Sequence, residues 1–312
     1  MSFTLALAAF GLLAWLVLAQ EVFRGNRRLK RLATLRAPAP SAWPRVSIVV
    51  AARNEAHTLP HALPTMLALD YPDFEIIVVD DRSEDGTGKY LDQLAAARPK
   101  LKVVHVTELP EGWLGKNHAL AEGSTLANGD WILFTDADIH FTPGTLQRAV
   151  AYARAQTLDH LAAVPRLTEQ GHWLGICVNA FSVAFTCGIL PWRIPDPRSR
   201  AHGGVGAFNL VRTSTYRKLG GHVPIHLRPD DDIKLGKLMK SGGFSELVLG
   251  EGAISVEWYA SVREMMLGLT KNAYAGADYR WWAPPLGAIV IVVGFLWPLV
   301  AWIVVPGPAR WC

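Results

Sequence analysis

VSIVVAARNE (residues 46–55) is an apolar run that ends in polar side chains, and EIIVVDDRSEDGT (residues 75–87) repeats that arrangement. Two further apolar runs follow, LKVVHV at residues 101–106 and DWILFT at residues 130–135. The first three are rich in Val and Ile without strict alternation, as expected of strands buried on both faces. Residues 57–69, 86–97 and 116–127 between them are long enough for helices. This alternation predicts an α/β fold with a mainly parallel, Rossmann-like sheet.

Polar side chains collect where three of the predicted strands end. The first run leads into Ala52-Arg53-Asn54-Glu55, the second ends at Asp80-Asp81, and the fourth leads into Asp136-Ala137-Asp138. In parallel sheets ligands bind beyond the carboxyl ends of the strands. One acidic strand end can be a helix cap, but three at one edge predict a shared binding site.

Two acidic motifs have side chains suited to chemistry at such an edge. Asp136 and Asp138 offer the oxygen ligands that Mg²⁺ and Mn²⁺ prefer, in combination with substrate phosphates. Asp230-Asp231-Asp232 precedes a helical apolar pattern, so its members can cap that helix, and one of them can act as a general base. Gly115-Lys116 opens a predicted helix, where the dipole and the ammonium favour anions, although the full P-loop pattern is absent.

The composition limits the classes of protein that are possible. Half of the 312 residues are hydrophobic and 19% are charged, which excludes a disordered chain and indicates contact with a membrane. The net charge of +4 arises from six basic residues within positions 24–36, so it predicts no nucleic-acid partner. The three cysteines lack zinc-site spacing.

The ends of the chain predict membrane helices. Residues 1–22 form an N-terminal anchor whose first twenty residues are uncharged, and residues 23–44 form a basic juxtamembrane linker. Basic residues on the C-terminal side of an apolar segment place that side in the cytoplasm. Residues 283–306 form a second uncharged segment near several tryptophans, predicted to be a C-terminal transmembrane helix. The catalytic domain between them, residues 45–256, is then cytoplasmic.

Two other apolar segments allow more than one interpretation. Residues 173–192 carry no charge and predict either a helix at the membrane interface or a buried core helix, with a true span the weakest option. A span there would separate the two acidic motifs. Residues 257–282 show a helical apolar stripe, which favours an amphipathic interfacial helix over a core-facing helix.

The motifs together resemble a family 2 glycosyltransferase with the GT-A fold. The matching segments are VSIVVAARNE, IIVVDDRSEDGT, GWLGKNHAL, WILFTDADI, AHGGVGAFNLVRTSTYRKLGG and PDDDIKLGKLMKSGG. They cover residues 45 to 250 in the family's order. These motifs are most similar to those of bacterial enzymes that glycosylate hopanoids or carotenoids. Ceramide glucosyltransferases have a similar organisation.

The resemblance implies a role for each matching position. The nucleoside of a nucleotide-sugar, with a UDP-sugar favoured, is held by Ala52, Asn54, Glu55 and Asp81, with Asp80 in support and Lys116 near the nucleotide. Asp136 and Asp138 hold the divalent metal and the diphosphate. Asp232 is the base, paired with Asp231, and residues 203–209 approach the acceptor.

The resemblance therefore implies an inverting, membrane-bound hexosyltransferase of the bacterial inner membrane, multi-pass, with a lipid acceptor. A polyprenyl phosphate acceptor, a nucleotidyltransferase and a non-catalytic nucleotide-binding membrane protein are the alternatives. The QxxRW-like motif of processive members is altered, because Ala277 stands where Gln is expected. Either Arg280-Trp281 or Lys271 replaces it, and this departure argues against a polymer synthase.

Overall fold

The computed structural model describes residues 3–168 and 171–292. Residues 29–265 form one compact unit, and residues up to 28 together with residues from 266 onward form another. The second of these contains α1 (Phe3–Asn26), most of α9 (Val262–Gly276) and α10 (Ala283–Ile291). Most of the predicted C-terminal membrane helix, residues 293–306, lies outside the described residues.

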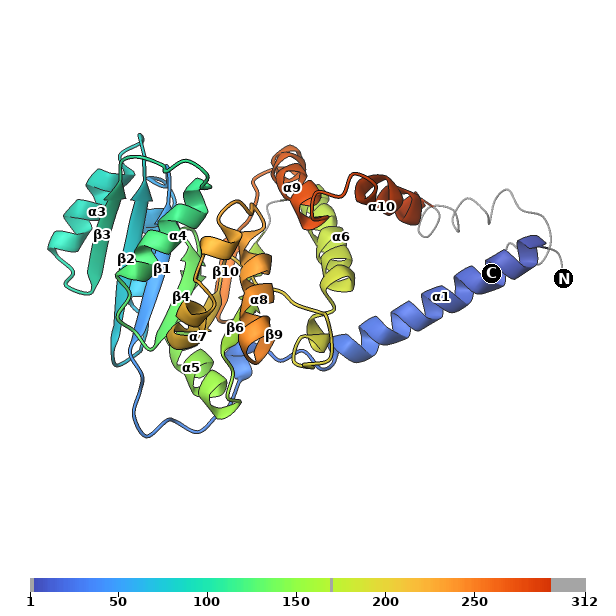
Figure 1. The fold of residues 1–312 in the computed structure, drawn as a ribbon, viewed down its shortest axis with the longest axis horizontal. Coiled ribbons are helices and arrows are strands. Elements are labelled where there is room, and N and C mark those ends of the chain that lie inside the picture. Colours follow the sequence, from blue (N-terminus) through green and yellow to red (C-terminus); the bar gives the residue numbers. More distant parts are fainter. Residues whose placement is uncertain (1–2, 169–170, 293–312) are drawn as a thin grey trace. The chain divides into compact units, whose positions relative to one another are not determined.

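The compact unit is built on a seven-stranded sheet (Figure 1). Its order is β3-β2-β1-β4-β8-β6-β9, and every neighbouring pair is parallel except those that include β8. The strands are β1 (Val46–Ala52), β2 (Phe74–Asp81), β3 (Leu101–Val106), β4 (Trp131–Asp136), β6 (His160–Val164), β8 (Asn209–Arg212) and β9 (Ser245–Leu249). A small second sheet contains β5 (His140–Phe141), β10 (Ile254–Glu257) and β7 (Arg166–Thr168).

The helices of this unit follow the strands. They are α2 (Leu59–Leu67), α3 (Thr87–Ala96), α4 (Gly115–Thr125), α5 (Thr145–Ala155), α6 (His172–Ile189), α7 (Thr213–Lys218) and α8 (Asp231–Gly242). The four predicted strands and the three helices between them are thus confirmed. Strands β6, β8 and β9 and the small sheet were not predicted from the sequence.

The central strands are buried on both faces, as their composition predicted. In β1, Ile48 and Val50 belong to one apolar cluster, whereas Val49 belongs to a second cluster on the opposite face. Helix α4 packs closely on the second face, because a Cβ atom added at Gly123 would lie 2.5 Å from Val49 Cγ1. Burial of this kind contributes roughly 1.5–3 kcal/mol for each large side chain.

The basic segment after residue 28 is part of the compact unit rather than a free linker. Leu32 is fully buried in the core, and Arg31 pairs with Leu249 beside β9. Lys30 contacts Tyr152 and lies 2.9 Å from Glu246 Oε1. The predicted linker of residues 23–44 therefore needs correction, because its first residues continue α1 and residues 29–35 are docked on the domain.

Helix α6 carries most of its apolar side chains on the surface. Leu174 and Val178 are buried, whereas Trp173, Ile176 and Val183 are more than half exposed. This exposure contradicts the interpretation as a buried core helix. Among the fully described helical segments, His172–Arg193 is the one long and apolar enough to cross a membrane. The predicted terminal membrane helices are not confirmed.

Candidate active site

The sheet topology brings the predicted site residues to one edge. Strand β1 lies between β2 and β4, with Ala52 beside Asp80 and Ala51 beside Asp136. The strand order runs outward from β1 through β2 to β3, and β4 lies on its other side. Such a reversal creates a crevice at the carboxyl ends of the strands, where ligands bind.

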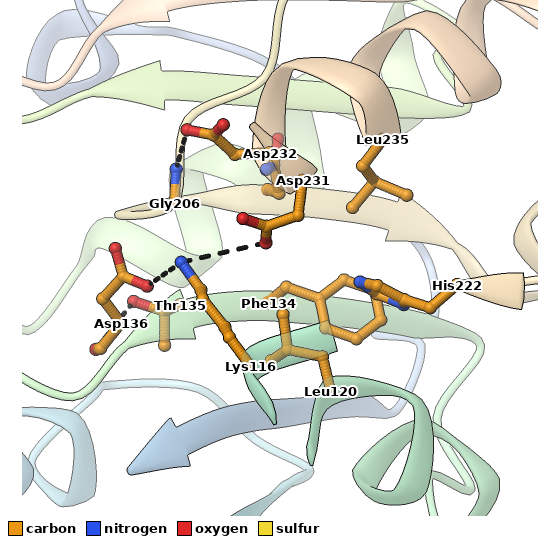
Figure 2. Close-up of a pocket in the computed structure, with 11 residues that line it drawn as sticks. Lys116, Leu120, Phe134, Thr135, Asp136, Gly206, His222, Asp231, Asp232 and Leu235 are labelled. Atoms are coloured by element: carbon orange, nitrogen blue, oxygen red, sulfur yellow. Dashed lines mark hydrogen bonds and ion pairs between the residues drawn. The ribbon is translucent and has the colours of Figure 1, made fainter. Parts of the chain in front are cut away.

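Lys116 joins two of the acidic motifs across this crevice (Figure 2). Its Nζ atom lies 2.6 Å from Asp136 Oδ1 and 3.8 Å from Asp231 Oδ2. Lys116 is the second residue of α4, Asp136 ends β4, and Asp231 begins α8. Residues separated by more than 100 positions in sequence therefore share one pocket, which Asp232 and Gly206 also line.

Gly206 connects Asp232, the next aspartate of the Asp230-Asp231-Asp232 motif, to β4. Its backbone N–H donates to Asp232 Oδ2 at 3.0 Å, and its carbonyl accepts from the N–H of Asp136 at 3.0 Å. A Cβ atom at this position would lie 2.5 Å from Asp136 Oδ2, so the close approach requires glycine. The N–H of Ile233 donates to Asp232 Oδ1 at 2.7 Å. These contacts orient the Asp232 carboxylate.

The three adjacent aspartates have different partners. Asp230 is held by Arg228 through hydrogen bonds of 2.8 and 2.9 Å, and Lys234 lies 3.5 Å from it. Asp231 faces Lys116, and Asp232 accepts backbone N–H groups. Asp230 is therefore neutralised within its own segment, which leaves Asp231 and Asp232 directed to the pocket.

Asn117 holds the loop that leads into these aspartates. Its Nδ2 atom donates to the carbonyls of Ile225, His226 and Arg228 at 2.8, 3.1 and 2.9 Å. Because Asn117 follows Lys116 directly, one turn of α4 positions both the ammonium and the loop that leads into the three aspartates.

The electrostatics of the pocket are dominated by carboxylates. Burial raises the pKa of Asp138 to about 7, with Asp136 adding to the effect. Burial also raises the pKa of Asp231 to about 7 against the attraction of Lys116, and it raises the pKa of Asp232. Burial would lower the pKa of Lys116, but the surrounding carboxylates raise it. Perturbation of this kind is typical of functional sites.

The carboxyl ends of β1 and β2 form the other half of the crevice. Asn54 has a φ of 57°, accepts from Glu84 N at 2.9 Å, and donates from its own N–H to Ser83 Oγ at 3.0 Å. Glu55 N donates to Thr87 Oγ1 at 2.8 Å, and burial raises the pKa of the Glu55 carboxyl. These hydrogen bonds connect the carboxyl end of β1 to the loop that follows β2.

Asp80 and Asp81 point to opposite faces of the sheet, as neighbours in a strand do. Asp81 lies against Gly115 at the start of α4, on the side of Lys116. Asp80 instead lies against Gly88 in α3 and 2.9 Å from His105 Nδ1. Asp80 is therefore separated from the pocket, in keeping with a supporting position. Ala52 is buried and presents its backbone at the end of β1.

Comparisons with known proteins agree with this architecture. The model of the family described as "Glycosyl transferase family 2" matches residues 47–174. This part of the chain is similar to family 2 glycosyltransferases. Those residues include β1 to β4 and the Asp136-Ala137-Asp138 motif.

Individual proteins are also similar to this chain. The 4,4'-diaponeurosporenoate glycosyltransferase of Staphylococcus haemolyticus is 28% identical over 75% of this chain and 62% of its own length. The beta-monoglucosyldiacylglycerol synthase of Synechocystis is 36% identical over 38% of this chain and 25% of its own. This chain thus spans between a quarter and about three fifths of these relatives.

A solved structure shares the fold. The mannosyltransferase PcManGT of Pyrobaculum calidifontis, determined in complex with GDP-Man and Mn²⁺, has a TM-score of 0.64 and 21% identity. The match covers 98% of this chain and 89% of that one. The GT-A type of sheet expected from the sequence is thus confirmed.

The carboxylates at the end of β4 fit a divalent cation. Asp136 and Asp138 supply hard oxygen donors, and Mg²⁺ or Mn²⁺ is often held by one or two carboxylates together with substrate phosphates. Within the described residues there is no cluster of three or more His, Cys, Asp or Glu suited to a metal. That donor set suits a cation shared with a substrate rather than one enclosed by protein.

Several residues that line the pocket were not predicted individually from the sequence. Gly206 was placed only within a segment near the acceptor, and its contacts with Asp136 and Asp232 depend on packing between β4 and α8. Asn209, at the end of the same segment, also lines the pocket, as does His222, which was not predicted. The fully buried His222 has a pKa lowered to about 3 by burial and by Lys116, so it is neutral. No local motif distinguishes these residues from ordinary turn residues.

Proposed function

We propose that this chain is an inverting glycosyltransferase that transfers a sugar from a nucleotide-sugar, with a UDP-sugar favoured, to a hydroxyl group of a lipid. The convergence of Asp136, Asp231 and Lys116 in one crevice carries the proposal. The family match and the relatives that glycosylate lipids or carotenoids, by their names, support it.

The chain's residues account for a single displacement. Asp232 takes the proton from the acceptor hydroxyl, whose oxygen then forms a bond to the anomeric carbon. The bond from that carbon to the diphosphate oxygen breaks on the opposite face, and a nucleoside diphosphate leaves. A divalent cation held by Asp136 and Asp138 would offset the charge that develops on the leaving group. One displacement with one base inverts the configuration.

The lipid acceptor is supported by the surface beside the site. Helix α6 exposes apolar side chains, and Ile189 at its end lies next to Gly203, since a Cβ atom there would be 3.1 Å from Ile189 Cγ2. Gly203 belongs to the segment that leads to Gly206 and Asp232. We propose that the acceptor's apolar part lies along α6 on the cytoplasmic side of a bacterial inner membrane, and the multi-pass arrangement stays a prediction.

The test is a transfer assay with the full chain purified in detergent. It uses labelled UDP-sugars, Mn²⁺ and lipid hydroxyl acceptors, and mass spectrometry identifies the products. We expect a nucleoside diphosphate and a glycosylated lipid. Release of pyrophosphate instead would favour a nucleotidyltransferase, and transfer only to polyprenyl phosphate would replace the acceptor class.

A binding measurement tests the cation separately. Asp138→Ala removes one oxygen donor, so we expect it to lose the part of nucleoside diphosphate affinity that depends on Mn²⁺. Calorimetry with UDP, with and without Mn²⁺, measures this difference. An unchanged metal dependence in the variant would remove Asp138 from the cation site.

A further inference from the structure

His222 is a buried side chain of the pocket wall that takes no part in the proposed reaction. It follows Gly220 and Gly221, whose φ values of 89° and 61° form the turn after α7. Its imidazole is 2% exposed and packs edge to face against Phe134, with ring centroids 4.9 Å apart. The Nε2 atom is buried and makes no hydrogen bond within the described part of the chain. Buried polar atoms without a partner are rare, so this atom indicates a ligand.

Three hydrogen bonds in series decide which nitrogen of His222 carries the proton. Ser124 Oγ donates to the carbonyl of Ala121 at 2.7 Å. Because a hydroxyl group has one proton, Ser124 Oγ is then the acceptor for Tyr216 Oη at 3.2 Å. Tyr216 has used its own proton in that bond, so its oxygen accepts from His222 Nδ1 at 2.5 Å. The imidazole proton is therefore on Nδ1.

The same series of hydrogen bonds gives Nε2 a lone pair. Burial and Lys116 lower the pKa of His222 to about 3, so the ring is neutral and has a single N–H group. Since that N–H group is bound to Tyr216, Nε2 is an acceptor. An acceptor pairs with an O–H or N–H group and not with a carboxylate or phosphate oxygen. The ligand of this atom is consequently a hydrogen-bond donor.

Two charged side chains line the same pocket as His222, namely Lys116 and Asp231 (Figure 2). The ammonium of Lys116 has three N–H groups, and its Nζ atom lies 2.6 Å from Asp136 Oδ1 and 3.8 Å from Asp231 Oδ2. The second distance is too long for a direct hydrogen bond. Polar groups at such a separation are often bridged by a water molecule.

The space in the pocket suits one water molecule. The lining residues leave about 10 Å³ of free volume, which is close to what one water needs and far too small for a sugar ring. A buried water typically has about three polar partners. Here it donates to His222 Nε2 and to the carboxylate of Asp231, and it accepts from the ammonium of Lys116. Both of its protons are then used.

We propose that this end of the pocket is a site for one ordered water molecule, with His222 as the positioning residue that holds the water between Lys116 and Asp231. Through the water, the two charged groups are connected to Tyr216 and Ser124, which are buried in the domain. The site requires no particular sugar or acceptor, and only its binding test rests on the proposed function.

The first experiment determines the tautomer of His222 by ¹⁵N nuclear magnetic resonance of the full chain in detergent, labelled at histidine. The signals that disappear in His222→Phe belong to His222. At neutral pH we expect a protonated Nδ1 and an unprotonated Nε2. Tyr216→Phe removes the acceptor for Nδ1, so a signal from a protonated Nε2 should appear in that variant. A protonated Nε2 in the wild type overturns the proposal.

The second experiment measures UDP affinity by calorimetry in the presence of Mn²⁺. His222→Phe keeps a ring but has no acceptor, so Lys116 loses its water and UDP should bind about tenfold more weakly. His222→Gln offers a side-chain carbonyl oxygen to the same water and should stay within about threefold of the wild type. His61→Phe, at an exposed position on α2, is the matched control and should bind normally.

Two results of the binding experiment overturn the inference. One is an unchanged affinity in His222→Phe, and the other is an equal loss in His222→Phe and His222→Gln, which would assign the effect to ring packing. Thermal unfolding shows whether the compared variants are folded. If the wild type binds no UDP, the proposed function fails as stated, and the tautomer still decides whether Nε2 can hold the water.

Discussion

Carboxylates near the amino ends and near the carboxyl ends of the parallel strands have opposite electrostatic circumstances. At the amino end, Glu75 accepts from Ser47 Oγ at 2.7 Å, from Lys102 Nζ at 2.7 Å and from Asn128 N at 3.1 Å. These partners outweigh burial and lower the pKa of Glu75 to about 2. At the carboxyl end, near Asp136, the pKa values of Asp138 and Asp231 rise to about 7.

The contrast separates a structural carboxylate from those for which we propose a function. Glu75 has a charged or polar partner for each oxygen, so its charge is satisfied by the folded chain alone. Near Lys116, several carboxylates share one ammonium, so the chain supplies fewer positive partners than there are carboxylates. Burial raises the carboxyl pKa at both ends, and the number of hydrogen-bonding and cationic partners decides the sign of the net pKa shift.

The largest expected effect is on catalysis at the carboxyl end. Asp232→Asn keeps the shape and an acceptor for one of the two backbone N–H groups but removes the base, so transfer should fall by about 10²- to 10⁴-fold. Nucleotide affinity, measured by calorimetry, should stay within twofold. Asp73→Asn, at an exposed carboxylate just before β2, is the matched control and should transfer normally. Normal transfer by Asp232→Asn would show that another group takes the proton.

A smaller effect is expected from the glycine that joins the two acidic motifs. Gly206→Ala places a methyl group where Asp136 Oδ2 would be 2.5 Å away, which displaces that carboxylate. A misplacement of about 1 Å can cost about 10²-fold in rate, so we expect a loss of this order without unfolding. Gly11→Ala, in open space on α1, is the control. Wild-type kinetics in Gly206→Ala would remove the geometric link between Asp136 and Asp232.

At the amino end the expected effect is on stability alone. Glu75→Gln retains an acceptor for Ser47 and loses the attraction to Lys102, so the free energy of unfolding should fall by about 1–3 kcal/mol at pH 7. The lowered pKa means that the wild-type advantage is present above about pH 4.5 and is lost as the pH falls through 2. Urea unfolding at pH 7 and pH 3 measures the loss of stability in the variant and its dependence on pH. A stability difference from wild type that is as large at pH 3 as at pH 7 would contradict the lowered pKa of Glu75.

A pH dependence of opposite sign is expected at the site. Since the folded-state pKa of Asp231 is about 7, against 3.8 as its ordinary value, its ionisation costs stability progressively as the pH rises toward 7. Asp231→Asn removes this cost, so without added metal its unfolding midpoint relative to wild type should be higher at pH 8 than at pH 5. A difference that is constant with pH would place the Asp231 charge in a solvated environment.

Local sequence was informative where neighbouring residues dictate structure. Val49, Ile77 and their neighbours form strands because apolar runs of this length can only be buried, and the acidic residues that follow them lie at strand ends for that reason alone. Both β4 with Asp136 and α8 with Asp231 could therefore be predicted. The short strands β6, β8 and β9 could not, because edge and antiparallel pairing depends on partners far away in the chain.

The amino-acid sequence alone predicts a mainly parallel sheet, acidic groups at the carboxyl ends of its strands, and an uncharged segment that forms α6. The partners of the individual aspartates, which look equivalent in the sequence, depend on the tertiary structure. Asp230 was neutralised by Arg228, Asp231 was turned toward Lys116, and Asp81 was covered by Arg82. The reason is that charge and hydrogen bonding act through distances of a few ångströms in space, which adjacency along the chain does not specify.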